Sequence, residues 1–235
     1  MNVASTLVLD FGGVISRTLF ETHELSERAL GLAPGTLDWR GPFDPDSDAL
    51  WRSMQAGEIS ERDYWLARTQ EVGKLVGQDW DQMQQFVQAA RGADVDAVMR
   101  PQALEAIALA KAAGKRLAIL SNELDLFYGS DFRDRISVLA HFDLIVDATY
   151  TEILKPDPRA YHFVTDALGL SASECVGDDA LGLSASECVF VDDQMKNIRG
   201  GEVAGMQCVW FDVMNPTNSY NQALALLGLP ALGEA

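Results

Sequence analysis

Four short segments of this chain end in polar residues that could do chemistry together. Three of the segments are expected to be buried strands, because each is a short apolar run bounded by glycine, proline or polar turn residues. In an open parallel sheet the carboxyl ends of all strands meet at one edge, and ligands bind there. The pattern therefore predicts one site with three carboxylates, one ammonium group and two small hydrogen-bonding groups. The polar ends are Asp10, Ser121-Asn122, Lys155 and Asp192-Asp193.

These groups suit phosphoryl transfer, which needs a nucleophile, a divalent cation and neutralised charge around the phosphorus. Asp10 can supply an oxygen nucleophile and form an aspartyl-phosphate. Three neighbouring carboxylates repel one another unless a hard cation lies between them, and Mg²⁺ prefers such oxygens. Lys155 would offset the negative charge of nucleophile and phosphate. Ser121 and Asn122 could hydrogen-bond the phosphoryl oxygens, helped by backbone N–H groups of the turn at Gly12-Gly13.

The elements that must position these groups alternate between strands and helices in the second half of the chain. Pro101 begins a helix and Gly114 ends it, and Pro158 opens another. Such alternation predicts a doubly wound, Rossmann-like parallel α/β sheet. Strands are expected at 7–9, 117–120, 144–146, 188–191 and 207–211, and helices at 101–114, about 124–139, 158–168 and 195–204.

The segment between the first strand and this alternating part is expected to be helical, without a convincing strand. Ser60 with Asp63 three residues later matches a capping box and predicts a helix start. Asp79 is expected to cap a further helix. These helices predict a small α-helical cap domain inserted after the first strand. The expected domains are a core, residues 1–15 and 93–235, and a cap, residues 16–92.

A tandem duplication lies within residues 167–192. The ten residues Ala167–Val176 recur letter for letter as Ala180–Val189. A repeat this short cannot be a solenoid unit, so it is a local duplication. The second copy continues into a full Val-Phe-Val run before its acidic pair, so we assign the strand to it. The first copy is expected to be an inserted surface loop or an extended helix, and the competing strand register, Val176-Gly177-Asp178, is less apolar.

The four polar ends, in this order, resemble the four motifs of the haloacid dehalogenase superfamily. The first reads Asp10-Phe-Gly-Gly-Val14 and the third Lys155-Pro156, and the inserted helices stand where that family carries a C1-type cap. The resemblance covers nearly the whole chain and is nearest to its sugar-phosphate (glucose-1-phosphate-like) phosphatases. It implies a Mg²⁺-dependent phosphoric monoester hydrolase. It also implies that Gly13 and Asn197 support the site, and that the metal ligands are Asp10, Asp192, Asp193 and the backbone carbonyl of Gly12.

The chain departs from that family at one position. Its phosphatases usually carry a second Asp two residues after the nucleophile, as general acid and then base, and here that residue is Gly12. Loss of a general acid typically costs about 10²–10⁴ in rate. A substrate that tolerates this loss would have a good leaving group, such as an anomeric hydroxyl or an acyl phosphate.

Two other functions stay open. In a 2-haloacid dehalogenase Asp10 would attack carbon and displace halide without a metal. Asp192 and Asp193 argue against it, because they would repel the carboxylate of a haloacid. The third hypothesis is a non-catalytic binding protein that kept the fold, against which the retained Asp10 and Lys155 weigh.

The composition and charge of the chain exclude some classes of binding partner. The formal net charge is −17, from 35 acidic and 18 basic residues, and such a surface repels nucleic acid and anionic membranes. No apolar run approaches the ~20 residues of a membrane helix, and no basic-then-apolar start suggests a secretory signal. Three cysteines without CxxC spacing fit reduced thiols. We therefore expect a cytoplasmic monomer or homodimer that acts on a small phosphorylated metabolite.

Overall fold

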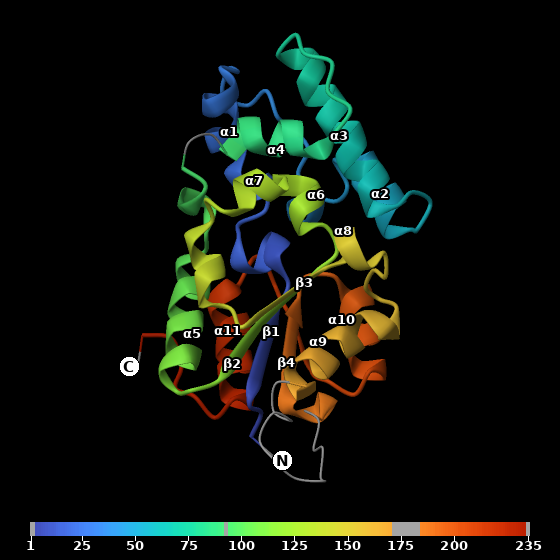
Figure 1. Ribbon diagram of the computed structural model, residues 1–235. Coiled ribbons are helices and arrows are strands. Elements are labelled where there is room, and N and C mark those ends of the chain that lie inside the picture. Colours follow the sequence, from blue (N-terminus) through green and yellow to red (C-terminus); the bar gives the residue numbers. More distant parts are fainter. Residues whose placement is uncertain (1–2, 92–93, 171–183, 234–235) are drawn as a thin grey trace. The chain divides into compact units, whose positions relative to one another are not determined.

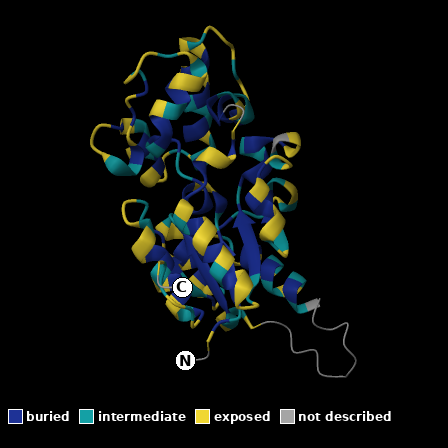
Figure 2. Cartoon of the chain, turned by 90° about the vertical axis from the view of Figure 1, so that its left-hand side faces the viewer, coloured by how far each residue is buried: buried dark blue, intermediate teal, exposed yellow. Residues whose placement is uncertain are grey.

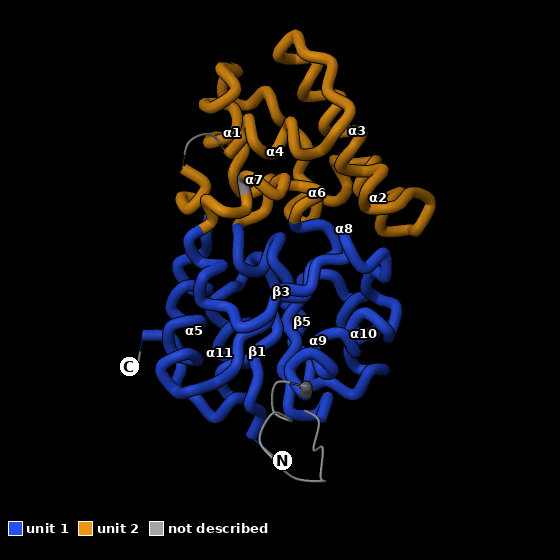
Figure 3. The backbone as a smooth tube through the Cα atoms, in the orientation of Figure 1, with its two compact units in different colours: residues 1–16, 99–124, 137–235 blue, residues 17–98, 125–136 orange. Residues whose placement is uncertain are grey.

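The computed structural model describes residues 3–91, 94–170 and 184–233, and the chain divides into two compact units (Figure 3). The core unit comprises Met1–Ser16, Met99–Leu124 and Ser137–Ala235. The helical unit comprises Arg17–Val98 and Asp125–Ile136. The bounds of the helical unit differ from those of the expected cap, because the unit extends to Val98 instead of ending at residue 92 and also includes the separate segment Asp125–Ile136.

The core unit is built on one sheet of five parallel strands in the order β3-β2-β1-β4-β5. Helices α5 and α11 cover one face of the sheet and α9 and α10 the other (Figure 1), which confirms the predicted doubly wound α/β fold. The strands are β1 (Thr6–Leu9), β2 (Arg116–Ser121), β3 (Leu144–Asp147), β4 (Cys188–Asp192) and β5 (Gln207–Trp210). The helices are α5 (Pro101–Ala112), α8 (Ala148–Thr151), α9 (Pro158–Leu170), α10 (Met195–Val203) and α11 (Pro216–Leu226), with turns of 3₁₀-helix at Ser137–His141 and Ala185–Glu187.

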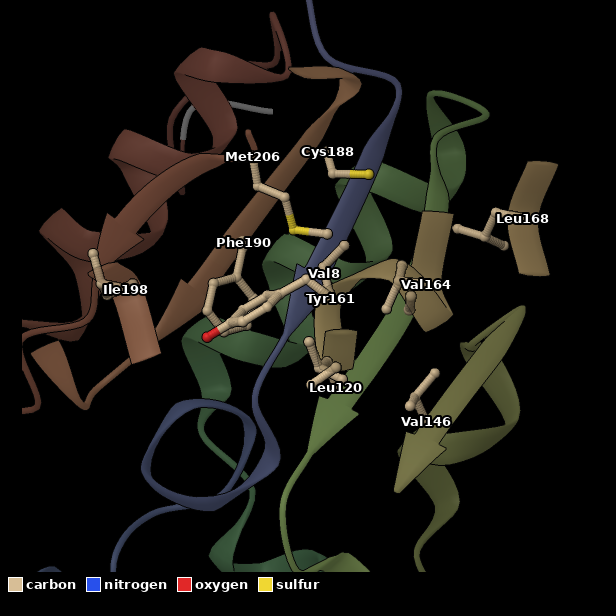
Figure 4. Close-up of a cluster of buried hydrophobic side chains, with 12 residues drawn as sticks. Val8, Leu120, Val146, Tyr161, Val164, Leu168, Cys188, Phe190, Ile198 and Met206 are labelled. Carbon is tan, nitrogen blue, oxygen red and sulfur yellow. The ribbon is translucent and has the colours of Figure 1, made fainter. Parts of the chain in front are cut away.

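Between their polar ends, the central strands β1, β2 and β4 are apolar, because both faces of the sheet are covered. Figure 2 shows them as buried, whereas the covering helices keep exposed outer faces. Alternate strand residues point to α9 and α10, where Tyr161 and Phe190 lie edge to face with ring centroids 5.3 Å apart. Figure 4 shows the cluster that they join, which includes Val8, Leu120, Val146, Val164 and Ile198.

The helical unit packs around aromatic side chains. The ring of Phe20 lies 5.3–5.4 Å from the rings of Trp39, Trp51 and Trp65, all of them buried. Its helices are α1 (His23–Leu30), α2 (Ala49–Gln55), α3 (Glu61–Leu75), α4 (Met83–Arg91) and α7 (Ser130–Arg133), with 3₁₀ turns at Phe20–Thr22, Gly41–Phe43 and Asp96–Val98. The short helix α6 (Leu124–Tyr128) begins at the boundary between the units.

Two expected helices of this part differ from the structure. Ser60 does form a capping box with Asp63 at the start of α3. The prediction that Asp79 caps the next helix is wrong, since α4 begins at Met83. The backbone N–H groups of Asp81 and Gln82, which precede α4, donate to the side-chain oxygen of Gln85 instead. The stretch expected to be helical over 124–139 is broken into α6, α7 and a 3₁₀ turn, with Gly129 in the left-handed conformation between the two helices.

The strand register brings the predicted polar ends to one edge of the sheet. Asp10 directly follows β1, while Ser121 and Asp192 are the last residues of β2 and β4. The strand β4 belongs to the second copy of the duplicated segment, as predicted. Of the first copy only residues 167–170 lie in the described part, at the end of α9, and the competing register at Val176 lies outside the described residues. In the described part of the chain, no helix is long and apolar enough to cross a bilayer.

Candidate active site

Three carboxylates meet at this edge of the core unit. One oxygen each of Asp10, Asp192 and Asp193 can be chosen so that all three lie within 4.8 Å of one another. Asp192 is fully buried and the other two are partly exposed. Since like charges at this separation repel strongly in a partly desolvated site, the cluster needs a compensating cation.

Lys155 supplies part of that compensation. Its ammonium group donates to Asp10 Oδ1 at 2.8 Å and to Asp192 Oδ2 at 2.6 Å. It also lies 5.4 Å from the centroid of the Phe190 ring. Burial by itself would lower the pKa of Lys155, but the attraction of the two carboxylates outweighs it and raises the pKa above its ordinary value. One lysine against three carboxylates leaves the cluster with a formal charge of about −2.

The side chain of Asp192 is saturated by donors of the chain itself. Besides Lys155, the Asn197 amide donates to both oxygens, at 3.0 and 3.1 Å, and the backbone N–H of Gln194 donates to Oδ1 at 2.8 Å. A carboxylate offers about four lone-pair sites, and these donors use all of them. In this arrangement Asp192 therefore anchors Lys155 and Asn197, and it could bind a cation only by giving up one of its hydrogen bonds.

Ser121 and Asn122 follow β2 but have different surroundings. Asn122 is bonded to the backbone of Lys155 on both ends of its amide: Oδ1 accepts the Lys155 N–H at 2.7 Å and Nδ2 donates to the Lys155 carbonyl at 3.1 Å. The Ser121 hydroxyl oxygen accepts the backbone N–H of Glu123 at 3.3 Å, which leaves its own proton available for donation. Asn122 thus positions Lys155, while Ser121 is the better placed donor for a bound anion.

Two buried side chains donate hydrogen bonds to the backbone of the glycine turn after β1. Gly13 has φ 78°, a left-handed conformation that glycine adopts without strain. The buried guanidinium of Arg100 donates through Nε to the Gly13 carbonyl at 3.0 Å, and the Tyr220 hydroxyl donates to the Val14 carbonyl at 3.1 Å. Gly12 itself is exposed, with the ordinary extended angles φ −70° and ψ 127°. These contacts fix the direction of the backbone groups that follow Asp10.

Several residues that support the site carry no signal in the sequence. Arg100 and Tyr220 are separated from the turn by 87 and 206 residues. The Tyr161 hydroxyl donates to the Asn197 carbonyl at 2.6 Å, and the Trp210 indole N–H donates to the Asp193 carbonyl at 2.9 Å. No local spacing could reveal such partners, because only the packing of α5, α9 and α11 on the sheet and the pairing of β5 with β4 bring them there.

The donor set of this cluster fits Mg²⁺. Mg²⁺ takes oxygen ligands at about 2.0–2.1 Å, so two oxygens on one ion lie at most about 4.2 Å apart. The separation of up to 4.8 Å between the three carboxylates therefore requires only small side-chain adjustments. Asp10 and Asp193 are the readier ligands, and the Gly12 carbonyl lies in the same turn as Asp10.

Two curated relatives match part of the chain. The mouse protein acyl-CoA dehydrogenase family member 10 is 30% identical over 132 residues, which are 55% of this chain and 11% of that protein. Phosphatase MT3486 of Mycobacterium tuberculosis is 26% identical over 112 residues, 48% of this chain and 46% of the phosphatase. The matches thus span less than half the length of these relatives.

Solved structures share the fold over most of the chain. The magnesium-bound HAD-hydrolase YfnB of Bacillus subtilis has a TM-score of 0.61 at 19% identity, covering 89% of this chain and 87% of YfnB. L-2-haloacid dehalogenase of Xanthobacter autotrophicus has a TM-score of 0.53 at 18% identity, covering 88% and 77%. The model of the haloacid dehalogenase-like hydrolases matches residues 4–205, a span that includes every element carrying the acidic cluster and its lysine. With sheet order, motif positions and family match in agreement, this chain belongs to the haloacid dehalogenase-like hydrolases.

Proposed function

We propose that this hydrolase is a Mg²⁺-dependent phosphatase of small phosphorylated metabolites that works through an aspartyl-phosphate on Asp10. The observation that carries the proposal is the convergence of Asp10, Asp192 and Asp193 with Lys155 bridging the first two. The phosphatase among the relatives and the magnesium in the YfnB structure support the same conclusion. When bound, Mg²⁺ would neutralise charge that develops on the transferring phosphoryl group.

Each residue of the cluster has a distinct task in the reaction. A carboxylate oxygen of Asp10 attacks phosphorus, the bond to the leaving oxygen breaks, and the phosphoryl group is transferred to Asp10. Lys155 holds the attacking carboxylate in place and offsets negative charge, with its own backbone fixed by Asn122. The Ser121 hydroxyl and N–H groups of the glycine turn donate to the phosphoryl oxygens. Water then hydrolyses the aspartyl-phosphate and releases phosphate.

The substrate follows from what Gly12 lacks. No carboxylic acid stands two residues after the nucleophile to protonate the leaving oxygen. The preferred substrates are therefore those whose leaving group departs without strong acid assistance, such as sugar 1-phosphates or acyl phosphates. We further propose that the helical unit acts as the cap that limits access of water during the reaction.

Dehalogenation is the weaker alternative. The fold also occurs in a haloacid dehalogenase, but that likeness is one of fold alone. A haloacid brings its own carboxylate to a cluster whose formal charge is already about −2. Without a cation, that charge disfavours the substrate.

The first experiment is hydrolysis of p-nitrophenyl phosphate with Mg²⁺ and with EDTA. The p-nitrophenolate leaving group is good enough to depart without a general acid. Turnover that requires Mg²⁺ and is lost in Asp10→Asn supports the proposal. Asp157→Asn is a matched control, because Asp157 is a carboxylate of the same unit whose charge pairs with Arg159 instead.

Two outcomes would contradict the proposal. Undiminished turnover in Asp10→Asn would exclude the aspartyl-phosphate. Absence of turnover with Mg²⁺, together with halide release from 2-chloropropionate, would instead establish the dehalogenase.

A further inference from the structure

The helical unit contains a cavity of its own. Its volume is about 530 Å³, within the range typical of small-molecule sites. It lies between α1 and the loop that follows that helix, and all the residues that line it belong to the helical unit. Its walls combine apolar side chains, Leu32, Pro34 and Leu37, with the charged residues Arg28 and Arg40.

The two arginines are unusual within this unit. The other arginines of its described residues each have an interaction partner, whether a carboxylate, a carbonyl or another group. Arg28 and Arg40 are exposed, and among the described residues their guanidinium groups show no hydrogen bond or ion pair. Both line the same cavity. Two guanidinium groups that share a cavity and lack an anion are suited to bind one, because their planar N–H donors match carboxylate and phosphoryl oxygens.

One of the two acids in the cavity wall is already engaged. Glu27 is buried, and its two oxygens accept the backbone N–H groups of Gly35 at 3.0 Å and Leu37 at 2.8 Å. This carboxylate therefore holds the loop against α1 and keeps the cavity in shape. Glu24, on the exposed side of α1, is the remaining acid of the lining, so within the lining the two arginines exceed the one uncommitted acid; Asp38 of the loop lies outside the lining but is close enough to act on His23.

We propose that this cavity binds a small organic oxyanion, with a carboxylate or phosphoryl group between Arg28 and Arg40 and a compact apolar body against Leu32, Pro34 and Leu37. The apolar wall favours an organic acid over an inorganic ion, because burial of its body adds to the charge-assisted hydrogen bonds. This site does not rest on the proposed phosphatase function, since it uses none of the core unit's residues.

His23 offers a local reporter for this site. It lines the cavity, its side chain is buried, and its ring centroid lies 4.3 Å from that of Trp39. The chain has three histidines, and the other two, His141 and His162, are exposed residues of the core unit. In this chain labelled with ¹³C at histidine Cε1, His141→Gln and His162→Gln would identify the His23 signal by elimination.

The experiment titrates this labelled protein with benzoate, phenylphosphonate and neutral benzyl alcohol. EDTA is present, so that the uncompensated carboxylates of the core unit disfavour anions there. We expect a saturable shift of the His23 signal with the anions and none with the alcohol. Each of Arg28→Gln and Arg40→Gln should weaken binding about tenfold, and the double variant should abolish the shift. The tighter of the two anions identifies the preferred head group.

Arg52→Gln is the matched control, since this exposed arginine of α2 is bonded to backbone carbonyls of the helical unit and lies outside the cavity. It should leave the titration unchanged. The proposal is overturned if His23 does not respond to either anion, responds equally to benzyl alcohol, or still responds in the double variant. Because the titration involves neither metal nor turnover, its failure would leave the phosphatase proposal untouched.

Discussion

The position of the missing general acid allows a gain of function by one substitution. In Gly12→Asp a carboxylic acid would stand two residues after Asp10, where the resembling phosphatases carry theirs. Gly12 has φ −70° and ψ 127°, which any residue adopts, and a Cβ placed there meets no heavy atom within 4 Å. The substitution should therefore fold normally, and reduced freedom of the unfolded chain could even add about 0.4–1 kcal/mol of stability.

The expected gain depends on the leaving group. A positioned general acid contributes about 10²–10⁴ to the rate when the leaving oxygen needs a proton. Gly12→Asp should raise kcat/KM for propyl phosphate by at least about a hundredfold. It should change p-nitrophenyl phosphate hydrolysis little, because that leaving group departs unprotonated. The decisive quantity is the ratio of the two kcat/KM values, measured with saturating Mg²⁺.

Two further variants make this prediction refutable. Gly12→Asn has nearly the same shape but no acidic proton, so its ratio should stay at that of the parent protein. Gly13→Ala should instead cost about 1–2 kcal/mol, because Gly13 has φ 78°. An unchanged ratio in a folded Gly12→Asp protein, or an equal gain in Gly12→Asn, would refute the view that leaving-group protonation limits this enzyme.

Three other perturbations follow from buried charges. Lys155→Met leaves two carboxylates uncompensated, so in EDTA we expect the free energy of unfolding to fall by about 3–5 kcal/mol, measured by chemical denaturation. Adding Mg²⁺ should raise the Tm of this variant more than that of the parent protein, measured by thermal denaturation. Arg100→Met removes the donor to the glycine turn and should lower kcat about 10- to 100-fold at saturating Mg²⁺ and substrate, whereas an unchanged kcat would show that the turn holds itself. Burial and then Arg40 lower the pKa of His23 to about 4 from its ordinary 6.5. Stability from the neutral ring is therefore complete above pH 6.5 and is lost as the pH falls toward 4. His23→Leu should reduce the acid-induced loss in the free energy of unfolding between neutral pH and pH 4.5 by about 2 kcal/mol, and identical pH profiles would contradict this.

The sequence determined the core of this protein because its signals are local. Short apolar runs bounded by turn residues predicted the strands, and their polar ends predicted the edge where Asp10, Ser121 and Asp192 now lie. The carboxyl ends of the strands must lie at one edge, because all strands of a parallel sheet run in the same direction. The order of the motifs along the chain also indicated the family. Helix ends with a specific local cap, such as Ser60, were predicted correctly, whereas Asp79 has the right residue type without the right hydrogen bonds.

Only the tertiary structure decided which role each polar side chain of the site has. The sequence assigned phosphoryl contacts to Asn122, but its amide is bonded to the backbone of Lys155 on both ends. It gave no sign that three donor groups saturate Asp192 with four hydrogen bonds, or that Arg100 reaches the glycine turn across 87 residues of chain. The sequence also did not predict the cavity of the helical unit, because it does not show which arginines have an interaction partner. The physical reason is common to all of these: a side chain's role depends on which donors, acceptors and charges the packing brings beside it, and those partners come from distant parts of the chain.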